Sequence, residues 1–411
     1  MISKSYQLLN YLNRPHGRFS QTFLGHLSWL GAMVVSRDRR LANWAKSCFL
    51  RNDFKQGFRT CAWMTRVSWP RLHVWADHFF DFTEGADTEL LDAMDQFLAR
   101  RQSRQPAHVA LSDQLYVLAA RVHGVVKKAG GDKKTVEPVI EAFNAKADEL
   151  LADVSERFTE ENEGVDDEER EGDFSVDHAK KALKDFAALF PKDQWPWYLV
   201  SGTLLGVYRD GGFMAHDYDI DLGVNDGEVD VVAMLDILEQ SPEFVVKKVD
   251  HHLEVSRLSH GNYNIQAYRT MYKVIHRDGV NLDIFIHYLE GDVLWHGSVI
   301  HRWDNKVYGL TDYELAGVPV LGPDEPDRYL TENYGDWRTP VTDFDCTTGT
   351  PNLVIARNFL SVALFLKRLG HFAHHDAHQY DKLRATLLRS GVVKESVDES
   401  GRRRLRIQDF L

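Results

Sequence analysis

The sequence predicts an α+β protein in which an all-helical first part precedes a part with mixed strands and helices. Residues 1–155 place apolar side chains at helical spacing, whereas short apolar runs alternate with helical patterns after residue 175. Between them, residues 156–173 hold ten carboxylates, two arginines and almost nothing to bury. We therefore expect a helical domain over 1–155, an acidic linker over 156–174 and a second domain over 175–411.

The helical part shows the 3.6-residue period in three early segments. The apolar residues that follow it are Leu41, Trp44, Ala45, Cys48 and Phe49, then Leu90, Leu91, Met94, Phe97 and Leu98, then Leu115, Leu118, Ala119 and Val122. Gly130 and Gly131 interrupt the pattern, and a longer helix is expected from about Thr135 to Phe158.

The second part reads as strands alternating with helices. Ser175 is a suitable N-cap for a helix over 176–190. Strands are expected over 198–200, 220–224, 244–249, 254–258, 266–276 and 281–288. Residues 309–352 are rich in Pro, Gly and Asp and are expected to form loops. Helices over 353–369 and 371–390 and a hairpin over 392–407 complete the prediction.

Composition places the chain among globular proteins, with 44% apolar and 27% charged residues in 411. No run approaches the ~20 apolar residues of a membrane span, and polar residues interrupt the start of the chain where a signal peptide would lie. The three cysteines lie far apart, which argues against a disulfide framework or a cysteine-based zinc site. We expect a cytoplasmic location.

Charge is unevenly distributed along the chain. Residues 1–135 carry 20 Lys and Arg against 11 Asp and Glu, whereas the whole chain has a net charge of −12. A basic module can attract a phosphorylated glycan, anionic lipid headgroups or nucleic acid. We expect the basic part to bind an anionic glycan acceptor. Peripheral contact with the inner membrane face is a further option. A solvated basic surface without a ligand is the simpler alternative.

The segment from Ser201 to Arg209 has the features of an anion site. An apolar strand ends in Ser201–Gly202–Thr203, and a helix begins immediately. Glycine permits close backbone approach, and helix-start N–H groups with the two hydroxyls suit a phosphate. Arg209 adds a fixed positive charge nearby. On its own this pattern is weak, because it also describes an ordinary capped helix.

Three aspartates follow at strand spacing. Asp217, Asp219 and Asp221 alternate with Tyr218, Ile220 and Leu222, so the three carboxylates share one face of a strand. Like charges this close repel one another unless a cation lies among them. Mg²⁺, which takes carboxylate and phosphate oxygens, satisfies the pattern, with Mn²⁺ as an alternative. A polar edge strand is the competing explanation, but Ile220, Leu222 and Val224 look buried.

Asp283 lies inside the apolar strand 281–288. A carboxylate is costly to bury without a partner. Pairing with the metal of Asp219 and Asp221 removes that cost, and a hydrogen-bonded strand aspartate is the alternative. We therefore expect Asp283 to be the third carboxylate of the site.

These motifs together resemble the LicD/fukutin group of nucleotidyltransferase-fold phosphotransferases, in its fukutin-like branch. The shared pattern is a strand, S-G-T-L-L-G, a basic residue, G-G and D-x-D-x-D followed by glycine. Tyr329–Leu330, Tyr334–Gly335–Asp336–Trp337, Pro340 and Pro351–Asn352 resemble the closing motifs of the branch. The resemblance covers roughly residues 176–360 and leaves 1–155 outside.

The resemblance implies a nucleotidyltransferase fold with a mixed sheet flanked by helices. It also implies transfer of a phospho-alcohol from a CDP-activated donor to a glycan hydroxyl, with release of CMP. Ribitol phosphate or glycerol phosphate is the expected group, and the acceptor a precursor of a capsule, lipopolysaccharide or teichoic-type polymer. By this resemblance Asp219, Asp221 and Asp283 are metal ligands, and Ser201, Gly202, Thr203 and Arg209 hold the donor phosphates.

The sequence leaves several alternatives open. Asp217 or Asp283 could accept the proton of the acceptor hydroxyl. Phosphocholine transfer, a non-catalytic glycan-binding scaffold and nucleotidylation of protein or tRNA are the rival functions. No nucleic-acid recognition motif is present, so we expect no nucleic-acid partner. His371, His374, His375 and His378 are expected on one helix, as a polar face rather than a metal site, because no second segment completes a ligand set.

Overall fold

The computed structural model describes residues 2–68, 88–154, 175–214, 219–341, 344, 346–347, 350–397 and 403–411. It confirms an α+β fold with a helical N-terminal region and a mixed sheet. Contacts divide the chain into two compact units. The sheet unit comprises Met1–Tyr11, Asp167–His252 and Tyr268–Val354, and the helical unit comprises Leu12–Asp166, Leu253–Ala267 and Ile355–Leu411. The acidic segment expected as a linker lies outside the described residues.

This division differs from the expected boundary, which assigned all of 175–411 to one domain. The C-terminal residues from Ile355 belong to the helical unit instead. The cause is helix α12 (Phe359–His375), in which every residue from Phe359 to Gly370 is buried. A helix that is buried on all sides needs neighbours on all sides. Helices α6 (Ala107–Lys128) and α7 (Lys133–Val154) supply that cover.

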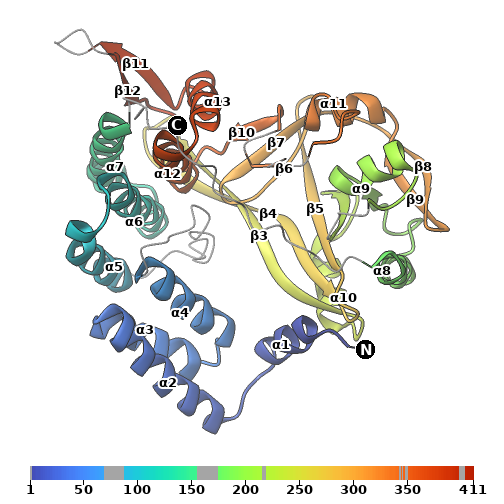
Figure 1. Cartoon of the computed structure of the whole chain (residues 1–411), viewed down its shortest axis with the longest axis horizontal. Coiled ribbons are helices and arrows are strands. Elements are labelled where there is room, and N and C mark those ends of the chain that lie inside the picture. Colours follow the sequence, from blue (N-terminus) through green and yellow to red (C-terminus); the bar gives the residue numbers. More distant parts are fainter. Residues whose placement is uncertain are drawn as a thin grey trace. The chain divides into compact units, whose positions relative to one another are not determined.

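The helical unit is a succession of packed helices closed by a small hairpin (Figure 1). Its further elements are α2 (Arg18–Ser36), α3 (Arg39–Leu50), α4 (Phe54–Ser68), α5 (Thr88–Arg101), a 3₁₀ turn (Gln102–Arg104), α13 (Ala377–Arg389), β11 (Val393–Val397) and β12 (Arg403–Ile407). Asp38 caps α3 by accepting from the N–H groups of Arg40 and Leu41. The hairpin was predicted, and the pairing of Val393 with Ile407 confirms it.

The start of α12 is fixed by one buried side chain. The amide of Asn358 accepts from Ser361 N–H at 2.8 Å and donates to the carbonyl of Leu253 at 2.7 Å. Within the helix, Lys367 pairs with buried Asp113 of α6 at 3.3 Å. Both polar contacts are inside the core, where an unpaired group would be costly, so they fix how α12 lies against its neighbours.

The sheet unit is built on a mixed sheet whose described strands run in the order β10-β7-β6-β5-β2-β1-β9-β8, with β4 also on β5 and β3 on β4 (Figure 1). The strands are β1 (Tyr198–Leu199), β2 (Asp219–Asn225), β3 (Phe244–Arg257), β4 (Tyr263–His276), β5 (Asn281–Glu290), β6 (Val293–Gly297), β7 (His301–Lys306), β8 (Leu310–Leu315), β9 (Val318–Pro323) and β10 (Leu353–Ile355). The helices are α1 (Lys4–Asn13), α8 (Val176–Leu189), α9 (Ser201–Leu205), α10 (Val231–Gln240) and α11 (Pro326–Tyr334). Ile220, Leu222 and Val224 enter the core, as predicted.

The prediction of loops over 309–352 was wrong in its first half. That stretch forms the hairpin β8–β9 and then α11. Ala316 and Gly317 form the turn, both with positive φ, and Pro326 stands in the first turn of α11, where proline is favoured. Glycine and proline here mark the ends of short elements, so their frequency did not indicate a loop.

Two further boundaries differ from expectation. Residues 244–257 form one long strand, β3, where two were predicted. The histidines expected on one helix fall on two, because α12 ends at His375 and Asp376 caps α13 through the N–H of Gln379. None of the described helices has both the length and the apolar character needed to cross a bilayer.

Gly131 provides a test of the helical unit. Gly131 has a φ of +74°, and a Cβ at this position would overlap the carbonyl oxygen of Tyr263. The two residues are held close because the N–H of Tyr263 donates to the carbonyl oxygen of Gly131 at 2.8 Å. Gly130→Ala is the matched control, since its φ is +57° but its Cβ would meet nothing within 4 Å. We expect Gly131→Ala to lower the unfolding free energy by at least ~3 kcal/mol and Gly130→Ala by about 1 kcal/mol, measured by denaturant unfolding. Equal effects would contradict the contact.

Candidate active site

Two neighbouring parallel strands bring the predicted carboxylates together. Asp219 and Asp221 lie on β2 and Asp283 on β5, and the strand register pairs Asp221 directly with Asp283. One oxygen from each of the three side chains lies within 4.8 Å of the others. Asp217, the fourth predicted carboxylate, lies outside the described residues. The structure therefore assembles three of the four predicted carboxylates into one cluster.

The cluster contains a cation that the sequence analysis did not identify. Lys273 of β4 stands opposite Asp283 in the antiparallel register, and its ammonium pairs with the Asp283 carboxylate. Burial alone would lower the pKa of Lys273, but the charge and hydrogen bond of Asp283, with Asp250 and Asp219 beyond it, outweigh that and raise the pKa. Lys273 is therefore protonated and offsets part of the negative charge. A lysine inside the apolar strand predicted over 266–276 was the available signal.

The Ser201–Gly202–Thr203 loop holds Asp221 from two sides. The N–H of Gly202 donates to Asp221 Oδ2 at 2.9 Å, and the hydroxyl of Thr203 accepts from the Asp221 N–H at 2.8 Å. Thr203 is 1% exposed. The loop was expected to hold donor phosphates, and in this structure two of its polar groups position a carboxylate. Its relation to a donor stays a prediction.

Ser201 has an unusual backbone conformation. Its φ of +47° lies in the left-handed region, which is costly for a serine. Its N–H donates to the hydroxyl of Tyr329 at 3.1 Å, and Tyr329 is 1% exposed on α11. Burial raises the pKa of Tyr329, so the phenol stays protonated. The closing motif Tyr329–Leu330 thus supports the loop from across the fold.

The glycines of the motif allow the chain to reverse beside the loop. After α9 a π-helical turn spans Gly206–Asp210, and Gly211 ends it with a φ of +79°. A Cβ at Gly206 would lie 2.6 Å from the carbonyl oxygen of Gly212. Only glycine accommodates this approach of two backbone segments, and the approach brings Arg209 back toward the sheet unit's core residue Met214.

Arg209 is fixed by its neighbours. Its guanidinium makes two hydrogen bonds to the Asp210 carboxylate, at 3.0 and 2.9 Å, and a longer one of 3.5 Å to the carbonyl of Trp337. The hydrogen bond to Asp210 raises the pKa of Arg209 against a smaller effect of burial. Its side chain is 16% exposed. A phosphate would therefore meet an arginine that is already positioned and half neutralised.

The three carboxylates suit a hard divalent cation. Mg²⁺ binds through one or a few carboxylates and completes its shell with water and phosphate oxygens. Asp219, Asp221 and Asp283 offer oxygen ligands alone, without sulfur or imidazole, on two strands that are held by the sheet. The donor set therefore fits Mg²⁺ or Mn²⁺.

Comparison with known proteins identifies the same region. Residues 194–324 match the family model described as the LicD/FKTN/FKRP nucleotidyltransferase domain. Over 184 residues the chain is 29% identical to the ribitol-5-phosphate transferase FKTN of Mus musculus and 28% identical to that of Homo sapiens. Each match covers 43% of this chain, and 35% and 36% of the relatives respectively. An uncharacterised protein of Rickettsia prowazekii (strain Madrid E) is 25% identical over 164 residues, which are 38% of this chain and 53% of the relative.

The match covers about a third of the length of these ribitol-5-phosphate transferases. The family-model match over residues 194–324 contains the loop from Ser201, the aspartates of β2 and Asp283, which are the residues that the structure brings together. Residues 194–324 of this chain are therefore similar to the LicD/FKTN/FKRP nucleotidyltransferase domain.

Proposed function

We propose that the chain is a Mg²⁺-dependent transferase that moves ribitol phosphate or glycerol phosphate from a CDP-activated donor to a hydroxyl of a surface-glycan precursor, releasing CMP. The observation that carries the proposal is the meeting of Asp219, Asp221 and Asp283 beside the Ser201–Thr203 loop. The similarity to ribitol-5-phosphate transferases supports an alditol phosphate as the transferred group.

In this proposal the three carboxylates hold the metal, which supplies positive charge to the donor phosphates. The residues around it do the positioning. Gly202 and Thr203 keep Asp221 oriented, and the ion pair with Lys273 keeps Asp283 in place. Arg209 contributes a second positive charge toward the donor. Phosphoryl transfer depends mainly on such positioning and charge, because little covalent help is needed.

The proton of the acceptor hydroxyl needs a carboxylate to receive it. Asp283 is engaged by Lys273, which favours Asp217 for this role. Asp217 stands two positions before the first residue of β2 in the sequence. The alternation of a strand predicts its carboxylate on the same face as that of Asp219. Asp217→Asn should then lower turnover without weakening metal binding.

The transferred group is tested by supplying one donor at a time. CMP release should be measured with CDP-ribitol, CDP-glycerol and CDP-choline, each with a phosphorylated glycan acceptor. The proposal expects release with an alditol donor. Release with CDP-choline alone would instead establish phosphocholine transfer, and no release with any donor would favour a non-catalytic scaffold.

The basic N-terminal part, residues 1–155, is the proposed binding region for the anionic acceptor. Its separate deletion is unsuitable as a test, since α6 and α7 bury α12 within the same unit. Acceptor affinity of the intact chain as a function of salt is the better measurement. The Debye length falls from ~10 Å at 0.1 M to ~3 Å at 1 M, so a binding surface of this kind should lose affinity as salt rises.

The metal ligands are tested by isosteric substitutions. Asp219→Asn and Asp221→Asn should each lower turnover at least ~100-fold, because each removes a charge that holds the cation. Relief of carboxylate repulsion should leave the melting temperature of the metal-free protein unchanged or raised. Asp236→Asn, on the exposed face of α10, is the matched control. Near-normal turnover of either site variant in Mg²⁺ would contradict the assignment.

Arg209 is tested with its own partner as control. Arg209→Ala should weaken binding of the CDP-donor by about 2 kcal/mol, the scale of a charge-assisted contact. Asp210→Asn removes the carboxylate that shares the guanidinium, so donor affinity should be unchanged or higher. Both affinities can be measured by calorimetric titration. Loss of affinity in both variants would show that the pair acts structurally and does not touch the donor.

A further inference from the structure

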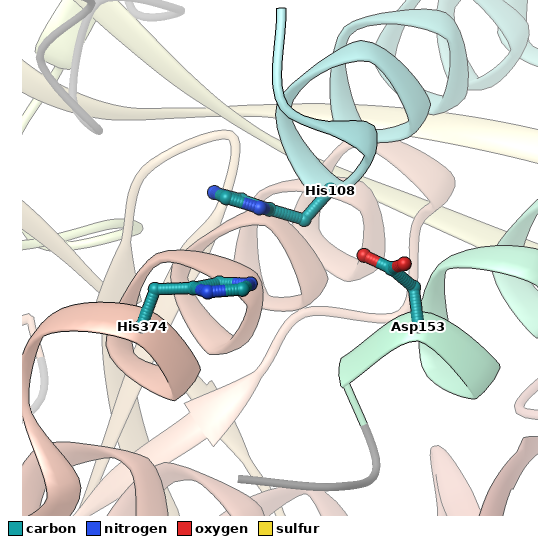
Figure 2. Close-up of side chains that lie close together, drawn as sticks. All are labelled: His108, Asp153 and His374. Carbon is teal, nitrogen blue, oxygen red and sulfur yellow. The ribbon is translucent and has the colours of Figure 1, made fainter. Parts of the chain in front are cut away.

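Three helices of the helical unit bring two imidazoles and a carboxylate together. His108 lies near the start of α6, Asp153 in the last turn of α7 and His374 in the last turn of α12. One ligand atom from each lies within 4.8 Å of the others. Figure 2 shows the two rings stacked face to face with the Asp153 carboxylate beside them, and the ring centroids are 4.0 Å apart. The second segment that the histidine-rich sequence lacked is thus supplied by α6 and α7.

The backbones that carry these residues are packed tightly. Gly370 lies one turn before His374 on α12. A Cβ added to Gly370 would lie 3.6 Å from side-chain atoms of His108 and Val154, so the three helices are in close contact here. The hydroxyl of Tyr380 on α13 donates to the carbonyl of Val154 at 3.0 Å. Asp153 and His374 are therefore borne by helix ends held in place by neighbours, as a pre-organised ligand set requires.

The charge around the cluster favours a cation. Asp153 lies at the carboxyl end of α7, where the helix dipole is negative and where no basic side chain stands in the last turn. It forms no ion pair with a lysine or arginine of the described chain.

A second histidine cluster shows the contrast. Asp185, Glu243 and His276 also lie within 4.8 Å of one another. There, however, Lys181 pairs with Asp185 at 3.2 Å and Arg277 pairs with Glu243 at 3.1 Å. Cationic side chains already balance those carboxylates, so that cluster needs no metal.

We propose that His108, Asp153 and His374 bind a divalent cation of the zinc class, which joins α6, α7 and α12. Two imidazoles and one carboxylate form a ligand set for Zn²⁺, with water in the remaining position. Bonds of about 2.0–2.2 Å place tetrahedral ligands roughly 3.4 Å apart, so ligand atoms that lie within 4.8 Å of one another approach by at most about 1.4 Å when the metal binds. Rotation of one stacked ring about its Cβ–Cγ bond provides that movement.

The test uses the full chain carrying Asp221→Asn, which disables the aspartate cluster, with Mg²⁺ in excess to occupy any oxygen-only site. Co²⁺ and Zn²⁺ are titrated into the chelator-treated protein. One equivalent should bind, and Co²⁺ should give the intense visible absorption of a four-coordinate nitrogen–oxygen site. Asp153→Asn and His374→Gln should each weaken binding at least ~10-fold, as loss of a ligand does.

His378→Gln is the matched control, since His378 is exposed on α13. The zinc-induced rise in melting temperature should persist in this variant and disappear in Asp153→Asn, which preserves side-chain volume. Three results would overturn the site: no stoichiometric binding, an octahedral Co²⁺ spectrum, or equal affinity in His374→Gln. If His374→Gln unfolds without metal, Asp153→Asn alone decides the question through its metal-dependent stability.

The outer face of α2 carries a row of exposed apolar side chains. Phe19, Phe23, Leu27, Leu30 and Val34 recur at helical spacing and are 83%, 56%, 54%, 56% and 72% exposed. The opposite face of this helix packs on α3 and α4. Such a continuous row of large apolar side chains on a helix surface marks an interaction site.

The charges near this face indicate the partner. Residues 12–37 contain no Asp or Glu and three basic residues, Arg14, Arg18 and Arg37. A second copy of the chain would bring the same positive charges against them in a symmetric contact, which is unfavourable. An anionic lipid surface offers the opposite charge to the arginines and a hydrocarbon region to the apolar row.

We infer that the α2 face docks on the surface of an anionic bilayer, with the helix lying in its plane. The intact chain should co-sediment with vesicles of phosphatidylcholine and about 30% phosphatidylglycerol, and much less with phosphatidylcholine alone. Replacing Phe19, Phe23 and Leu27 together by Ser, Ser and Gln should weaken binding at least ~30-fold, because buried apolar area drives insertion. Leu289→Gln, at another exposed leucine, is the control.

Two outcomes would overturn this docking. Equal binding of the triple variant and the native chain would remove the α2 face from the contact. A concentration-dependent dimer that the triple substitution abolishes, without vesicle binding by the native chain, would assign the face to self-association. Far-UV circular dichroism should show unchanged helix content, since the three side chains are exposed.

Discussion

Repulsion among Asp219, Asp221 and Asp283 is the constraint on which the sheet unit depends. The parallel register of β2 and β5 sets Asp221 against Asp283, and nothing in strand pairing itself compensates for that. Gly202 and Thr203 hold Asp221 through one hydrogen bond each, and Lys273 pairs with Asp283. The neighbouring groups thus maintain a concentration of negative charge that a divalent cation can use.

The motif residues around the cluster act through backbone geometry more than through direct chemistry. Ser201 keeps a left-handed conformation while its N–H donates to Tyr329, and Gly206 lets the chain return against Gly212. Both features fix the loop that orients Asp221. A loop that was expected to bind phosphate therefore supports the Asp221 carboxylate in the described structure. Donor binding would add to this role, since Arg209 already stands at the end of the same turn.

The helical unit is held together by a different interaction, the burial of α12. Its apolar surface requires cover from α6 and α7, so residues far apart in the sequence become neighbours. This packing brings His108 and Asp153 to His374 and joins the C-terminal segment to the N-terminal helices. The same unit exposes the apolar face of α2.

By itself, the sequence determined the fold class, the strands of the aspartate motif and the burial of Ile220 and Leu222 in the core. These features could be predicted because the two-residue period of strands and the 3.6-residue period of helices are local patterns. It also indicated Asp283 through the cost of a carboxylate in an apolar strand. Tertiary structure alone decided that Lys273 faces Asp283, that Asp210 occupies Arg209 and that His374 meets α6 and α7. Strand register and helix packing act between distant residues, which no local pattern encodes. That is also why the C-terminal helices were expected in one unit and lie in the other.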